Sequence, residues 1–129
     1  MPYSEADEAK LALVRGMYEN VLFALDETRV DDYIAQDYIQ HSSLAEPGIE
    51  GLKSWLRTAR VESPEARQTL HHLLVDGDRV MGHTHVIRWP GDRGCAVMDI
   101  YRIEDGKIKE HWDVIQEIPE TPVNPTPMF

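Results

Sequence analysis

Basic side chains are scarce in this chain of 129 residues: 13 Lys and Arg stand against 23 Asp and Glu, which gives a net charge of −10. A field of this sign repels phosphate backbones and anionic lipid surfaces. Long apolar runs are also lacking, because polar residues interrupt them well before the roughly 20 residues that span a bilayer. We therefore expect no nucleic-acid partner and no membrane contact.

Cysteine is almost absent, because Cys95 stands alone. An intrachain disulfide and a multi-cysteine zinc site are thereby excluded. Residues 1–5 lack the basic and apolar regions of a signal peptide, and a cytoplasmic location is expected. The glycines fall in turns and form no phosphate-binding loop or dinucleotide fingerprint, so no cofactor is expected.

Three helices are predicted in the first half of the chain. Ser4, followed by Glu5 and Asp7, is typical of a helix N-cap with acidic residues in its first turn. A second, short helix is expected over residues 30–35 and a third over residues 49–60. The first and third carry apolar residues at helical spacing: Leu11, Val14, Tyr18, Val21, Leu22 and Leu25 in the first, and Leu52, Trp55, Leu56 and Ala59 in the third.

The second half of the chain has a strand-like pattern. Residues 68–75, 79–89, 95–103 and 107–117 are rich in β-formers, and the segments between them read as hairpin turns. The order predicts an α+β fold, with three N-terminal helices packed on an antiparallel sheet of four or more strands. We expect one domain over residues 1–118 and an extended or disordered Pro-rich tail over residues 119–129.

Ionisable residues interrupt the apolar pattern of the last predicted hairpin. A three-residue loop over residues 104–106 would pair Ile103 with Lys107 and set Asp99 opposite His111. Asp99, His111 and Asp113 then share one face, together with Tyr101 and Ile115. A two-residue loop is the alternative, and it would set Asp99 against Trp112 and separate it from Asp113. Either this face is solvated, or it lines a half-buried cavity in which desolvation raises a carboxyl pKa and creates a general acid/base near neutral pH.

Histidine is frequent, and an imidazole is the side chain whose ordinary pKa lies nearest neutrality. Either His71 or His72 is expected near His83, across the turn at residues 76–78. A structural histidine is an alternative interpretation at each position. A zinc site built from His83, His85 and His111 with an acid is a further alternative, but we predict no metal. The histidines are His41, His71, His72, His83, His85 and His111.

Several stretches of the chain resemble the SnoaL-like polyketide cyclase family of the nuclear-transport-factor-2-like superfamily, over residues 10–118. They are Tyr38-Ile39-Gln40-His41, Asp76-Gly77-Asp78-Arg79-Val80, Asp99-Ile100-Tyr101-Arg102, Gly106-Lys107-Ile108 and Glu110-His111-Trp112-Asp113-Val114. The resemblance implies a cone-shaped α+β barrel of three helices on a strongly bent sheet, with an apolar cavity and cofactor-free acid/base chemistry. It also implies that Asp113 is the acid/base. Asp99 stands where those cyclases carry a histidine.

Our hypothesis from the sequence is a cofactor-independent enzyme acting on a small, mostly apolar carbonyl compound, as an aldol cyclase, isomerase or lyase. Asp113 would carry the proton, His111 or Asp99 would tune it, and His41 with His83 or His85 would polarise the substrate oxygen. The expected substrate-binding residues are Tyr18, Tyr38, Trp55, His85, Met98 and Tyr101.

Two alternatives belong to other classes: a non-catalytic protein that binds a hydrophobic ligand in the same cavity, and a metal-dependent lyase or hydrolase with histidine ligands. The outer sheet face, with Ile100, Trp112 and Val114, would need cover, which predicts a homodimer.

Overall fold

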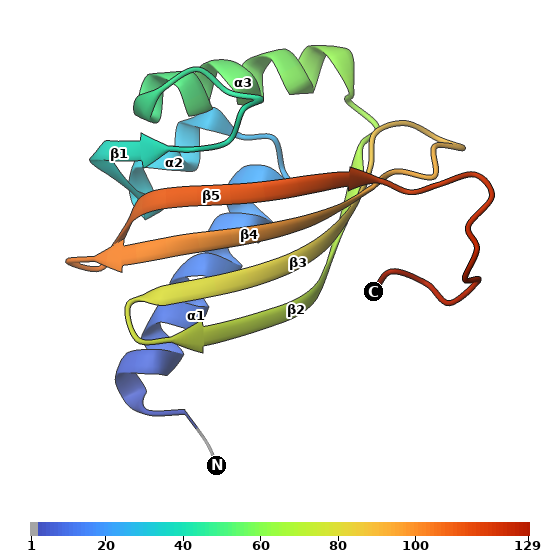
Figure 1. Ribbon diagram of the computed structural model, residues 1–129. Coiled ribbons are helices and arrows are strands. Elements are labelled where there is room, and N and C mark those ends of the chain that lie inside the picture. The colour runs from blue at the N-terminus through green and yellow to red at the C-terminus, as the bar shows by residue number, and fades with distance from the viewer. Residues whose placement is uncertain (1–2) are drawn as a thin grey trace.

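The computed structural model describes residues 3–129 and confirms the α+β arrangement (Figure 1). The helical elements are α1 (Glu5–Met17), the π-helical turn η1 (Tyr18–Leu22), the 3₁₀ turn η2 (Glu27–Arg29), α2 (Val30–Tyr33) and α3 (Gly48–Glu62). The strands are β1 (Ile34–Gln40), β2 (Arg67–Asp76), β3 (Arg79–Ile87), β4 (Cys95–Glu104) and β5 (Lys107–Glu117). Within residues 3–129, no helix has the length and apolarity needed to cross a membrane.

The local sequence explains where α1 begins and what it buries. The Ser4 side chain accepts a hydrogen bond from the backbone N–H of Asp7 (3.1 Å), which satisfies one of the free amides of the first turn. The apolar stripe buries Met17 and then runs on into η1, where Tyr18 and Val21 are buried. The helix therefore delivers a phenol, only 1% exposed, to the interior of the domain.

The sheet has the strand order β1-β5-β4-β3-β2. Strands β2 to β5 form the expected antiparallel meander, and the short strand β1 adds a fifth, parallel partner beside β5. In this parallel pairing Gln40 lies beside His111, and the backbone N–H of His41 donates to the carbonyl of His111 (2.9 Å). The segment that leads out of the helices is thus fixed along the last strand.

The turn between β4 and β5 is shorter than predicted. Asp105 and Gly106 both have positive φ angles (50° and 74°), the geometry of a two-residue hairpin turn, and Glu104 pairs with Lys107. The predicted pairing of Ile103 with Lys107 across a three-residue loop is therefore wrong.

A bulge also changes the register of this hairpin. The pairing shifts between Arg102 and Ile103, where β5 contains one residue more than β4. As a result Asp99 lies opposite Asp113 and Tyr101 lies opposite His111, so the predicted pairing of Asp99 with His111 is wrong by two residues. A shift of two leaves each side chain on its predicted face.

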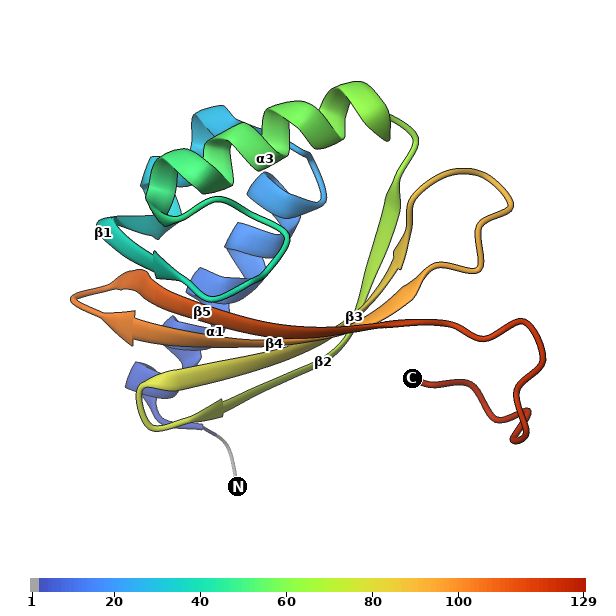
Figure 2. The same cartoon turned by 45° about the horizontal axis from the view of Figure 1, so that its top comes forward.

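The helices all lie on one face of the curved, unclosed sheet, which we call the inner face, and the opposite side is the outer face (Figure 2). The apolar core lies between helices and inner face. Its most completely buried members come from both layers: Val14, Met17, Tyr18, Val21, Val30, Leu56, Val80 and Ile108.

The tail, residues 119–129, forms neither helix nor strand and folds back toward the outer face (Figure 2). The ring of Phe129 stacks on His71 and His85, each with ring centroids 4.6 Å apart, and lies 5.2 Å from the ring of His83. A surface hollow of about 480 Å³ lies between the tail and this part of the sheet. The tail therefore covers one end of the outer face.

Candidate functional site

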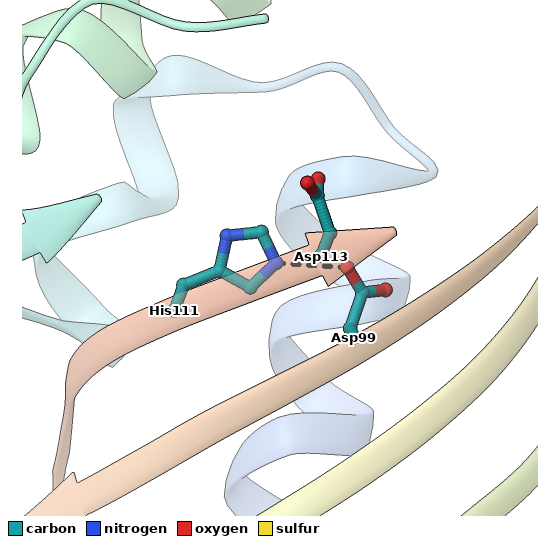
Figure 3. Close-up of side chains that lie close together, drawn as sticks. All are labelled: Asp99, His111 and Asp113. Atoms are coloured by element: carbon teal, nitrogen blue, oxygen red, sulfur yellow. Dashed lines mark hydrogen bonds and ion pairs between the residues drawn. The ribbon is translucent and has the colours of Figure 1, made fainter. Parts of the chain in front are cut away.

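The centre of the candidate site is a buried pair of side chains on adjacent strands. Asp99 of β4 and His111 of β5 are only 5% and 9% exposed, and His111 Nε2 lies 2.8 Å from Asp99 Oδ1 (Figure 3). The other carboxylate oxygen of Asp99 accepts a hydrogen bond from the Tyr18 hydroxyl at 2.7 Å. Both oxygens of this carboxylate are therefore occupied by neighbours within the chain.

A glycine makes the contact of Tyr18 with Asp99 sterically feasible. Gly82 of β3 lies opposite Asp99 on the inner face, and a Cβ atom built there would stand 2.1 Å from the Tyr18 hydroxyl oxygen. Any larger residue would displace the phenol. Glycine within a strand often marks such a close approach, and here it lets a residue from η1 reach β4.

The other ring nitrogen of His111 is held by β1. His111 Nδ1 lies 2.7 Å from Gln40 Oε1, and the same oxygen accepts a hydrogen bond from the backbone N–H of Ser42 (3.0 Å). The amide nitrogen of Gln40 donates to the Tyr38 hydroxyl at 2.8 Å. One continuous chain of hydrogen bonds therefore runs from Tyr38 through Gln40, His111 and Asp99 to Tyr18.

Asp113 lies beside this chain without belonging to it. Its carboxylate points away from the contact of His111 with Asp99 (Figure 3), and within residues 3–129 no protein group forms a hydrogen bond or ion pair with it. Exposure on this face rises along β5: His111 is 9% exposed, Asp113 is partly buried and Ile115 is 38% exposed. Asp113 thus stands where the covered part of the inner face opens to solvent.

Tyrosines surround the polar chain. Tyr101 is 3% exposed, stacks on the His111 ring at 4.8 Å, and has a hydroxyl for which the described residues provide no hydrogen-bond partner. Burial is the main cause that raises the pKa of Tyr101 and also of Tyr18 and Tyr38, and the Asp99 charge adds to it. All three phenols therefore stay protonated near neutral pH and can act as hydrogen-bond donors.

Only part of the predicted site is brought together. Its members on the inner face are Asp99, His111, Asp113, Tyr18, Tyr38 and Tyr101. Trp55 of α3 is partly buried against the apolar core. The buried pair agrees with the half-buried alternative for this face and not with the solvated one.

Four predicted site residues lie elsewhere, on the outer face. His83 pairs with Met98 across β3 and β4, and His85 and His83 lie beside Phe129 of the tail. His41 stacks on Trp112 and contacts Glu110. Gly82 and Thr84, which alternate with His83 and His85 along β3, lie on the inner face. The prediction that His41, His83 and His85 face the substrate of Asp113 is therefore wrong.

The prediction that His71 or His72 lies near His83 is confirmed for His72. His72 pairs with His83 across the first hairpin, and the two rings stack at 5.4 Å between centroids. Because His83 and His85 lie on the opposite face from His111, the structure contradicts a zinc site shared by these three histidines.

A cation site would need other donors. Within residues 3–129, one group of three potential ligands has its donor atoms within 4.8 Å of one another: Asp99, His111 and Asp113. Two of these residues, His111 and Asp99, already form a hydrogen bond with each other. We therefore interpret the cluster as a proton-sharing group.

Sequence reasoning missed two residues of the site, Gln40 and Gly82. Gln40 was visible only as part of the segment before His41, and its contact with His111 spans 71 positions of the chain. Gly82 did carry a signal, since it is an isolated glycine inside a predicted strand.

Two surface hollows lie away from the buried pair. The tail residues line the first together with His71 and His85, and the second, of about 330 Å³, lies beside α2, β1 and the turn at Asp105. Neither includes Asp99, His111 or Asp113. An apolar cavity between helices and sheet therefore stays a prediction.

The chain is similar to known proteins in family and in fold. Residues 14–111 match the family model of the SnoaL-like domain, and the match ends two positions before Asp113. No curated protein matches the chain.

Three solved structures illustrate the likeness in fold. A protein from Bacillus cereus, provisionally named a polyketide cyclase, is 22% identical, with 88% of this chain and 78% of that chain covered and a TM-score of 0.75. TsrD from Streptomyces laurentii is 24% identical (88% and 91% covered, TM-score 0.66). An NTF2-like protein of unknown function from Mesorhizobium loti is 18% identical (89% and 97% covered, TM-score 0.72).

Proposed function

The chain belongs to the SnoaL-like domain family, and we propose that it is a cofactor-independent acid/base enzyme that acts on a small, mostly apolar carbonyl compound. Asp113 is the proton carrier in this proposal. The reaction is of the aldol cyclase, isomerase or lyase type. These types share one elementary step, the removal of a proton from the carbon next to a carbonyl group.

The observation that carries the proposal is the contrast between the two neighbouring carboxylates. Asp99 is 5% exposed, and both of its oxygens are hydrogen-bonded within the chain, so neither is free to contact a substrate. Asp113 has no partner among the described residues and stands at the open part of the inner face. Paired titratable groups in different environments are typical of acid/base sites, where one member holds charge and the other moves protons.

In the proposed step, an oxygen of Asp113 takes a proton from the α-carbon of the substrate. The electron pair of the broken C–H bond moves into the bond between the α-carbon and the carbonyl carbon, and the carbonyl oxygen becomes an enolate. The enolate carbon then attacks a second carbonyl or takes a proton at another position. The proton held by Asp113 returns to the product, so no other reactant is required.

The substrate oxygen needs hydrogen-bond donors, and the outer-face histidines do not reach it. Tyr38 is a better candidate, because it lies on the inner face and remains protonated. The Tyr38 hydroxyl accepts from Gln40, which leaves its own proton free, whereas the Tyr101 hydroxyl is enclosed in the core. Donors fixed in a site of low dielectric stabilise a developing oxyanion.

The test is Asp113→Asn, assayed with a panel of carbonyl compounds that can undergo enolisation. Asn has the same shape and no basic oxygen, so we expect kcat to fall about 100-fold or more while folding is retained. Asp76→Asn, at the exposed end of β2, is the matched control and should be fully active. Undiminished turnover by Asp113→Asn would overturn the role of Asp113.

The same assay addresses the alternative of a non-catalytic binding protein. Such a protein would bind hydrophobic carbonyl compounds with equal affinity in the wild type and in Asp113→Asn, and would convert none of them. The homodimer stays a prediction: Met98 (45%) and Val114 (73%) are exposed on the outer face, whereas Trp112 is partly covered by His41 and Arg79.

A further inference from the structure

The hydrogen bonds around Gln40 determine which atom of its side-chain amide faces His111. The backbone N–H of Ser42 can only donate, and it lies 3.0 Å from Gln40 Oε1, so this atom is the carbonyl oxygen of the amide. The amide nitrogen on the other side donates to Tyr38. His111 Nδ1 therefore faces an acceptor at 2.7 Å and must carry a proton.

The proton on Nδ1 determines what the other ring nitrogen of His111 can do. A neutral imidazole has one protonated nitrogen, and with the proton on Nδ1 the Nε2 atom has only a lone pair. Nε2 nevertheless lies 2.8 Å from Asp99 Oδ1, a contact that two lone pairs cannot make. A second proton must lie in that contact, on His111 as an imidazolium or on Asp99 as a carboxylic acid.

We infer that Gln40 is a positioning residue that fixes His111 with Nδ1 protonated and thereby makes the pair of His111 and Asp99 retain one additional proton. The inference rests on the proposed function for its catalytic meaning. With this proton, the pair is neutral overall, and Asp113 is the one uncompensated charge of the cluster. Without it, Asp99 would add an uncompensated negative charge beside the enolate that forms when Asp113 takes the proton, and this step would be less favourable.

The neighbours of the pair support this charge balance. The Tyr18 hydroxyl donates to Asp99, and Tyr101 stacks on the His111 ring without offering it a charge. Ser42 lies just after the end of β1. The orientation of the Gln40 amide, and with it the tautomer of His111 (the tautomer lock), therefore depends on the parallel pairing of β1 with β5. Gln40 touches His111 and not the reacting atoms, which makes it a positioning residue.

The direct test is nitrogen NMR of His111 through long-range proton–nitrogen correlations, between pH 6 and 8, in protein with labelled histidine. We expect Nδ1 to be protonated in the wild type throughout this range. Gln40→Met has a side chain of similar length with no acceptor, so its His111 should shift to the tautomer with Nε2 protonated and donating to Asp99. Gln40→Glu keeps an acceptor oxygen and should keep Nδ1 protonated.

Gln36→Met is the matched control, because Gln36 is an exposed residue of the same strand, and it should leave the His111 signals unchanged. A bare Nδ1 in the wild type would overturn the inference, and so would a protonated Nδ1 in Gln40→Met. The wild-type spectrum alone decides the first point, even if a variant does not fold.

Activity separates this inference from the proposed function. We expect Gln40→Met to lower kcat about tenfold or more with little change in KM, and Gln40→Glu to recover part of it. Equal kcat in the wild type and Gln40→Met would overturn the catalytic part of the inference. If the NMR results are as expected and no carbonyl compound is converted, the tautomer lock stands and the proposed function is wrong.

Discussion

Each face of the sheet carries a histidine paired with a carboxylate. The two pairs are close in the chain, because His111 of the inner pair directly follows Glu110 of the outer pair on β5. On the inner face, His111 lies 2.8 Å from Asp99, with side chains 11% and 7% exposed. On the outer face, His41 lies 2.7 Å from Glu110, with side chains 42% and 16% exposed. The contact distances are nearly equal, so distance alone does not distinguish a structural ion pair from a candidate catalytic one.

The difference lies in what else touches each imidazole. The second nitrogen of His111 has an acceptor, Gln40, whereas the ring of His41 lies flat on Trp112 at 4.9 Å. Glu110 also accepts a hydrogen bond from Arg102 Nε at 2.9 Å. The contacts with His41 and Arg102 lower the pKa of Glu110, and the contact with His41 has the larger effect. The outer pair is therefore a solvated surface contact, and the inner pair is a closed network whose protons are fixed by burial and by direct partners.

The largest expected difference between the two pairs is in their contribution to the free energy of unfolding. Asp99→Ala leaves His111 Nε2 and the Tyr18 hydroxyl without partners in a buried site, which should lower the free energy of unfolding by about 3 kcal/mol. Glu110→Ala removes a partly buried carboxylate whose partner His41 is exposed, and it should lower the free energy of unfolding less, because water can replace the lost contacts. Urea denaturation of both variants measures the difference. Equal losses would show that burial does not separate the two pairs.

A second, smaller effect should follow from filling the space above Gly82. Gly82→Ala places a Cβ atom against the Tyr18 hydroxyl, so Tyr18 must move away from Asp99, at a cost of about 2 kcal/mol. Removing that hydroxyl in Tyr18→Phe relieves part of the clash. The double variant should therefore lose less stability than the sum of the single variants. Strict additivity would mean that Tyr18 and Gly82 do not constrain each other.

The sequence was sufficient to predict which residues of β4 and β5 share the inner face, because successive side chains of a strand alternate between its two faces. The register was predicted wrongly, because Asp105-Gly106, a pair typical of two-residue turns, was interpreted as part of a three-residue loop, and because the bulge in β5 opposite Arg102 has no distinct local pattern. The resulting error of two residues kept Asp99, His111 and Asp113 on a common face. An error of one residue would have placed them on opposite faces.

The sequence was not sufficient to predict which side chains of β3 and β1 lie near Asp99 and His111. The loop between β3 and β4 is long, so the register of His83 and His85 against Asp99 could not be counted from a turn. Gln40 reaches His111 through a parallel pairing with a strand far along the chain, and such contacts leave no local periodicity. The polar partner that orients the imidazole could be found only from coordinates.

The smallest expected effect is the pH dependence of the outer pair. Glu110 has a pKa below its ordinary value, so its stabilising contribution is complete above the unfolded pKa of about 4.3 and is lost as the pH falls through the folded pKa. Glu110→Gln cannot titrate. The free energies of unfolding of the two proteins should therefore differ most at pH 6 and converge toward pH 3. High salt should also reduce the difference, because His41 in this pair is exposed. A difference that persists at pH 3 would mean that the Glu110 contacts do not depend on its charge, and the outer pair would then resemble the inner one.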